Sequence, residues 1–207
     1  LVPLAPLHQP QNLHLIRTIA ALKPGLVQTA SFDTAFHRTQ SDLVRRFAIP
    51  REWFDKGVKR YGFHGLSYTH IACRLKSLEP DTAGGLAVVA HLGSGASLCA
   101  IDHGVSRDTS MGFSTIDGVP MATRSGAIDP GVIVHLMASH GLDAKAVEDL
   151  LYRQSGLLGL SGISADSRTL LETPACAARE AIEVFTFRIA GEVARLSASL
   201  GGDRKST

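Results

Sequence analysis

A glycine-rich turn between two apolar runs is the part of this sequence best suited to chemistry. Residues 86–92 and 96–101 are largely apolar, and Gly93, Ser94 and Gly95 separate them. The two runs predict neighbouring antiparallel strands. Because glycine has no Cβ, the turn could present several backbone N–H groups to an anion such as a phosphate. An ordinary hairpin turn is the alternative interpretation, and the lysine of a Walker loop is absent.

Three further side chains stand where a ligand could bind. His64 lies in a glycine-flanked, aromatic stretch, so the backbone around it could approach a ligand closely. Arg124 lies in a loop of Gly, Ser and Thr, and the guanidinium fork suits phosphoryl groups. Asp33 follows an apolar run, residues 26–32, which predicts a strand whose C-terminal end is a usual ligand position in α/β sheets. A structural histidine and a solvated arginine are the alternatives.

Composition and cysteine usage narrow the class of protein. Apolar residues make up 44% of the 207 residues, which is typical of a globular protein with a core. The net charge is +2 with scattered basic residues, which argues against a nucleic-acid or membrane-surface partner. No apolar run is long enough to span a bilayer. Cys73, Cys99 and Cys176 are far apart, which favours a reducing cytoplasm, and the nine histidines form no metallohydrolase motif.

Periodicity and capping signals predict the elements that position these residues. A three-stranded meander is expected over residues 85–110, followed by a polar loop over residues 111–126. Helices are expected over residues 10–23, 67–78, 129–141, 143–154 and 174–200, with a short helix and loop within residues 41–57. Ser67 and Asp129 are the expected N-caps of two of them, and Asp166 could be a simple helix cap as well.

The order of these motifs resembles that of the acetate/propionate kinase family. The matching segments are residues 4–8, 32–37, 61–65, 91–95, 108–113, 123–126 and 128–131. The resemblance implies an incomplete α/β fold of the actin-like ATPase (ribonuclease H-like) type, with a mixed sheet and flanking helices. It also implies two domains, in which residues 1–37 end the first domain and residues 38–207 begin the second, nucleotide-binding domain.

The resemblance assigns roles to particular residues. Asp33, His64 and Arg124 match the catalytic positions, and the ATP-binding positions match His91, Leu92, Gly93, Ser94, Gly95, Asp166, Ser167 and Arg168. The implied reaction is acetate kinase activity, in which ATP and acetate give ADP and acetyl phosphate with Mg²⁺ as cofactor. Since a carboxylate nucleophile carries no proton to remove, we expect Asp33 to order the Mg²⁺ shell through water rather than to shuttle a proton. No residue is expected to bind the metal directly.

The sequence departs from the family pattern in ways that concern which subfamily it belongs to and how much of the family protein it contains. Ser94 stands where many members have Asn, and Ala127 where many have Asp. The family protein is roughly twice as long and this chain begins with Leu1, so we expect a central fragment that is inactive alone. The resemblance implies a cytoplasmic homodimer at full length. Propionate kinase remains an alternative, since one methylene changes discrimination by only about 1–3 kcal/mol. A non-catalytic nucleotide-binding or oligomerisation module is another.

Overall fold

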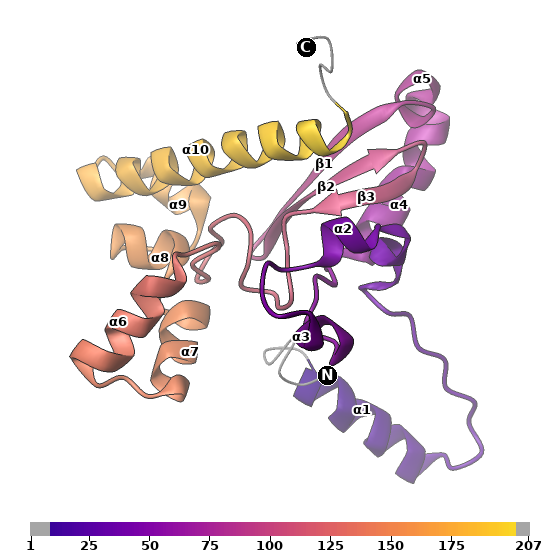
Figure 1. Ribbon diagram of the computed structural model, residues 1–207, viewed down its shortest axis with the longest axis horizontal. Helices are drawn as coiled ribbons and strands as arrows, with labels where there is room; N and C mark the ends of the chain where they lie inside the picture. Colours follow the sequence, from indigo (N-terminus) through magenta and orange to yellow (C-terminus); the bar gives the residue numbers. More distant parts are fainter. Residues whose placement is uncertain (1–8, 202–207) are drawn as a thin grey trace.

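The computed structural model describes residues 9–201, in which helices surround one antiparallel sheet (Figure 1). The strands are β1 (Leu86–Leu92), β2 (Ala96–Asp102) and β3 (Val105–Thr109), paired in that order. The meander predicted for residues 85–110 is therefore confirmed. The motif at residues 4–8 and the tail after Gly201 lie outside the described residues.

Several helices begin and end where their sequence signals predict. Asp129 and Asp143 cap two helices, because their carboxylates accept the N–H groups of Gly131 and Ala146. The helical segments within the described residues are α1 (Gln9–Leu22), the 3-10 helix η2 (Ala35–Thr39), α2 (Asp42–Arg45), α3 (Arg51–Asp55), α4 (Gly65–Leu78), α5 (Pro80–Ala83), α6 (Pro130–His140), α7 (Ala144–Arg153), α8 (Gly156–Ser161), α9 (Ser167–Glu172) and α10 (Cys176–Ser199). None of these helices is both long and apolar enough to cross a membrane.

The central strand β2 is buried because both faces of the sheet are covered. Alternate side chains of a strand point to opposite faces. Leu98 packs with Leu196 of α10 in one apolar cluster, and Cys99 packs with Tyr68 of α4 in another. The sheet therefore stands between α10 on one side and α4 with η2 on the other.

Helix α10 joins the sheet to the small helices α8 and α9. It contacts all three strands as well as α8 and α9, and Figure 1 shows it running from α9 to the strands. Near its N-terminus, Ala178 and Ala181 pack against Leu157 of α8 and Leu170 of α9. The helix predicted over residues 174–200 is thus confirmed, and it holds the two halves of the described chain together.

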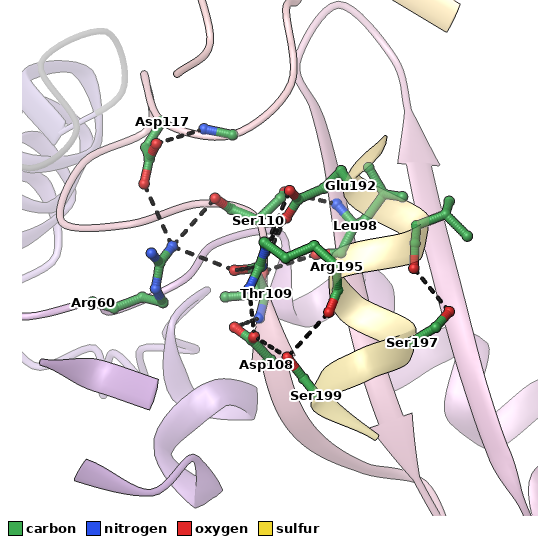
Figure 2. A network of polar contacts seen from close by, with 12 residues as sticks. Arg60, Leu98, Asp108, Thr109, Ser110, Asp117, Glu192, Arg195, Ser197 and Ser199 are labelled. Carbon is green, nitrogen blue, oxygen red and sulfur yellow. Dashed lines mark hydrogen bonds and ion pairs between the residues drawn. The ribbon is translucent and has the colours of Figure 1, made fainter. Parts of the chain in front are cut away.

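A polar cluster of Asp108, Arg195 and Ser199, which we call the α10 clamp, holds β3 to this helix (Figure 2). Asp108 is 3% exposed, and its Oδ2 accepts hydrogen bonds from Arg195 Nη1 and Ser199 Oγ, each at 2.7 Å. On the other side of β3, Arg60 forms an ion pair with Asp117 at 3.4 Å, which anchors the loop that follows the strand. The motif at residues 108–113 therefore has a structural role, because its Asp108 binds α10.

Two sequence predictions are wrong. Residues 26–32 form no strand; they are exposed and pair with no strand among the described residues, so the described sheet is antiparallel rather than mixed. An apolar run needs a partner edge to become a strand, and none lies beside this segment. Ser67 does not cap α4, because that helix begins two residues earlier, at Gly65. The short helices α8 and α9 lacked a periodic signal and were not predicted as helices.

Candidate active site

The turn between β1 and β2 meets two of the predicted catalytic side chains at Gly95. A β-carbon on this residue would lie 2.6 Å from Arg124 Nη2 and 3.2 Å from His64 Nε2. Neither Gly93 nor Gly95 has a positive φ, so neither is required for an unusual backbone conformation. Gly95 is needed instead because the arginine and the histidine approach its backbone closely.

Arg124 is a buried cation that no described carboxylate neutralises. Its side chain belongs to a residue that is only 7% exposed, and its Nη1 donates a hydrogen bond to the Thr115 carbonyl at 2.7 Å. Burial lowers the pKa of the guanidinium, because desolvation disfavours the charged form. The buried Thr115 hydroxyl also has no hydrogen-bond partner among the described residues. A negatively charged ligand at the turn would neutralise the guanidinium.

His64 is fixed at its Nδ1 side. It has a left-handed conformation with φ of 58°, and its Nδ1 lies 2.8 Å from Ser97 Oγ. Its ring stacks on that of His91 with 4.2 Å between centroids, and His91 Nδ1 lies 3.0 Å from Ser67 Oγ. The opposite nitrogen, Nε2, faces the Gly95 backbone and Arg124. The two rings therefore support each other beside the turn.

Asp33 holds the main chain of His64. Its Oδ2 accepts the His64 N–H at 2.6 Å, and its Oδ1 accepts the Leu66 N–H at 3.3 Å. A β-carbon on Gly65 would lie 2.1 Å from the Asp33 carbonyl oxygen, so only glycine fits there. The carboxylate accepts an N–H group at the positive end of α4, and Asp33 thus takes the capping role that was predicted for Ser67. Asp33 thus positions His64 from the segment before η2.

Parts of the two predicted nucleotide segments line one groove, whereas His91 and Gly95 are not among its lining residues. Leu92, Gly93 and Ser94 form one wall, and Asp166, Ser167 and Arg168 form another, around a volume of about 690 Å³. Asp166 caps α9 by accepting the Arg168 N–H, and it also forms an ion pair with the Arg168 side chain at 3.0 Å. The helix-cap interpretation is therefore correct, and the capped turn faces the same groove as the glycine turn.

A buried histidine supports the backbone just before His64. His37 Nε2 donates to the Phe63 carbonyl at 2.9 Å, and its Nδ1 lies 2.9 Å from Ser106 Oγ. A β-carbon on Gly62 would lie 2.6 Å from the His37 ring. Burial lowers the pKa of His37, although the bond to the Phe63 carbonyl acts in the opposite direction. His37 was part of a matching segment, but nothing in its spacing predicted this role.

The described residues alone do not complete a metal site. No three or more His, Cys, Asp or Glu side chains within residues 9–201 gather closely enough to hold a metal ion. Asp33 offers a carboxylate next to His64, with its oxygens already receiving two N–H groups. A carboxylate has about four acceptor positions, so Asp33 can still accept from metal-bound water.

An α/β scaffold that brings a buried arginine and an anchored histidine to a Gly-x-Gly turn, beside an open groove, is typical of phosphotransferases. A family model described as the acetokinase family matches residues 1–205. The chain belongs to this family.

Individual relatives agree with this assignment. The chain is 53% identical over 204 residues to an acetate kinase of Rhodopseudomonas palustris strain TIE-1, covering 96% of this chain and 50% of that protein. It is similar to a crystal structure of Porphyromonas gingivalis acetate kinase, with a TM-score of 0.87, 39% identity and coverage of 97% and 51%. A propionate kinase from Francisella tularensis gives a TM-score of 0.89, 36% identity and coverage of 95% and 52%.

These comparisons also define what part of the family protein is present. The chain spans about half the length of the relatives it matches. Its α/β fold is the corresponding part of the actin-like ATPase fold shared by these kinases.

Proposed function

We propose that this chain forms the phosphoryl- and nucleotide-binding part of an acetate kinase, a phosphotransferase with a carboxyl group as acceptor. The observation that carries the proposal is the meeting of Arg124 and His64 at Gly95, next to the groove. The matched curated relatives are acetate kinases, which favours acetate over propionate as the substrate.

The geometry supports a division of roles. The groove between residues 92–94 and residues 166–168 suits ATP or ADP, with the phosphates directed toward Gly95. Arg124 and His64 would stabilise the charge that spreads over the oxygens of the transferred phosphoryl group. Acetate needs no base, since its carboxylate is already ionised at neutral pH. Positioning and charge neutralisation are therefore the main tasks of these side chains.

We assign Asp33 a positioning role that also suits the cofactor. Mg²⁺ when bound supplies further neutralisation of phosphate charge. Asp33 would contact its water shell while holding the main chain of His64, as its hydrogen bonds to the His64 and Leu66 N–H groups support. The same carboxylate would thus align the histidine and the cofactor.

The remaining proposals concern the complete enzyme, by which we mean the protein at the full length of its relatives. We propose that residues 1–207 alone are inactive, because the chain spans about half of those relatives. The free thiols of Cys73, Cys99 and Cys176 fit a cytoplasmic protein. A homodimer and a domain boundary near residue 37 are also proposed. Helix α1 buries none of its residues, which is consistent with a separate domain before that boundary.

Substitution of Arg124 in the complete enzyme tests the central proposal. We expect Arg124→Ala to lower kcat by about 10²–10³, the loss typical of one charge-stabilising donor, with a smaller change in KM for ATP. Arg153→Ala is the matched control, because Arg153 pairs with Asp149 on the exposed side of α7. A variant with normal kcat and only a raised KM would show that Arg124 merely binds substrate. Two inactive proteins, parent and variant alike, would favour a non-catalytic module.

A further inference from the structure

A row of hydrogen-bonding side chains runs from the core of the sheet to His64. Tyr68 Oη contacts Ser97 Oγ, and Ser97 Oγ in turn lies 2.8 Å from His64 Nδ1. Ser97 and Tyr68 are both fully buried, so no solvent competes for their hydrogen bonds. The end of the row is His64 Nε2, which faces the backbone of Gly95.

Three arrangements of protons are possible in this row, because a hydroxyl donates one hydrogen bond and accepts two. In the first, the Tyr68 hydroxyl donates to Ser97, and the Ser97 hydroxyl donates to Nδ1 of His64, so neutral His64 carries its proton on Nε2. In the second, Nδ1–H donates to Ser97, Ser97 donates to Tyr68, and Tyr68 must find another acceptor. In the third, Nδ1–H and the Tyr68 hydroxyl both donate to Ser97, and the Ser97 hydroxyl must find another acceptor. The second and third arrangements put the proton of the neutral ring on Nδ1, opposite to the first.

The contacts of the two hydroxyls disfavour the second and third arrangements. Among the described residues, Tyr68 Oη has no hydrogen-bond acceptor besides Ser97 Oγ, and Ser97 Oγ has none besides Tyr68 Oη and His64 Nδ1. The second arrangement would leave the buried Tyr68 proton without an acceptor, and the third would leave the buried Ser97 proton without one. Only the first arrangement uses both protons. Burial also raises the pKa of Tyr68, so the phenol stays protonated and remains a donor.

The position of Arg124 argues in the same direction. Its Nη2 and His64 Nε2 both crowd the Gly95 backbone. A second positive charge beside a buried guanidinium would be disfavoured, so His64 gains from remaining neutral. A neutral histidine can still donate a hydrogen bond toward the ligand, provided that its proton is on Nε2.

We propose that Tyr68 and Ser97 are positioning residues that hold neutral His64 in its Nε2–H tautomer, so that it presents a hydrogen-bond donor beside Arg124. The use of that donor on a phosphoryl oxygen rests on the proposed function. The tautomer itself does not, because it follows from contacts within the chain.

The tautomer is measured directly on this chain by nitrogen-15 NMR of labelled histidine at alkaline pH, with the His64 signal assigned from its loss in His64→Gln. We expect Nε2 to carry the proton in the parent chain. Ser97→Ala removes one buried oxygen and should convert His64 to a mixture of tautomers, and Tyr68→Phe should shift the population in the same direction. Tyr61→Phe is the control, since it removes a phenol that donates to the Gly57 carbonyl, which is not part of this row, and should leave the tautomer unchanged.

Two results would overturn the proposal: a proton on Nδ1 in the parent chain, or a tautomer that is indifferent to both Ser97→Ala and Tyr68→Phe. In the complete enzyme, we expect Ser97→Ala to lower kcat by about tenfold while KM for ATP changes little. An Nε2–H tautomer together with a normal kcat in Arg124→Ala would sustain this inference and reject the proposed function, so the two can fail separately.

Discussion

Gly95 determines where the Arg124 guanidinium and the His64 ring can lie, because it has no side chain. The missing β-carbon leaves room for the Arg124 guanidinium against the backbone, and this arrangement directs the charge toward the turn. Loops that cradle anions usually owe their glycines to backbone conformation. Here the close approach of a cation is the physical reason.

Gly95→Ala should therefore weaken nucleotide binding. The new methyl carbon would lie 2.6 Å from Arg124 Nη2, so the guanidinium must move away from the turn. We expect the Kd for ATP in the complete enzyme to rise by about tenfold, as for the loss of a charged hydrogen bond. Calorimetric titration measures it. Gly191→Ala is the control, because a β-carbon there meets nothing within 4 Å and α10 gains about 1 kcal/mol in helix propensity. Equal ATP affinity in the Gly95 variant and the parent would contradict the packing argument.

His37 should make the stability of the chain depend on pH. Its folded pKa lies below the ordinary value of 6.5, chiefly through desolvation, so the unfolded chain binds a proton that the folded chain does not. The free energy of unfolding should be level above about pH 6.5 and fall as the pH drops below it, by up to about 1.4 kcal/mol per pH unit. Urea titrations between pH 8 and pH 5 measure this slope.

The comparison variants separate His37 from the other histidines. His37→Gln should be less stable at pH 8 but show a flatter pH dependence than the parent. His70→Gln, at an exposed position of α4, should keep the slope of the parent chain. A His37→Gln variant with the same slope as the parent would mean that the buried ring is not the group responsible.

At the scale of elements, α10 depends on the clamp that holds it to β3. Arg195→Leu would leave the buried carboxylate of Asp108 with only the Ser199 hydroxyl and a backbone N–H. Loss of one partner of a buried ion pair costs about 3–5 kcal/mol, and the half-exposed position of Arg195 reduces the expected loss of unfolding free energy to about 1–3 kcal/mol. Chemical denaturation measures it.

Arg179→Leu provides the matched control on the same helix. Its ion pair with Glu183 is exposed on both sides, so its loss should cost less than about 0.5 kcal/mol. If the two variants lose the same stability, the clamp adds nothing beyond an ordinary surface ion pair.

The elements that could be predicted are those whose signals are local. Asp129 followed by proline predicts the start of α6, and two apolar runs on either side of a glycine turn predict β1 and β2. Residues 26–32 carry an equally apolar run, but a strand also requires a partner edge, and that requirement is invisible in the sequence. For helix α9, the sequence indicated only the cap at Asp166, because a helix of six residues shows too little apolar periodicity to be predicted.

The residues of the candidate site also fall into two groups, those that could be selected from the sequence and those that could not. His64, Arg124 and the glycine turn could be selected by residue type and by the family resemblance, and the structure brings them together. Ser97 and Tyr68 could not, because their importance comes from the register of β2 and from a helix that packs on it. A buried serine or tyrosine in isolation is indistinguishable from ordinary core.

At the scale of the whole molecule, we expect residues 1–207 alone to form no acetyl phosphate from ATP and acetate. The described residues hold only part of the donors that phosphoryl transfer needs, and they do not complete a metal site. A coupled assay with Mg²⁺ tests the isolated chain beside the complete enzyme as the positive control. Turnover near that of the complete enzyme would show that this half is sufficient.

The unneutralised charge of Arg124 links the stability of the chain to the composition of the solution around it. A ligand that binds only the folded state raises the free energy of unfolding by mass action, by about 2.7 kcal/mol at a hundred times its Kd. Because the guanidinium is buried and unpaired among the described residues, the folded chain without an anion is less stable than its packing alone would allow. Under the proposed function, nucleotide is such a ligand, and we expect its addition to raise the free energy of unfolding of the chain.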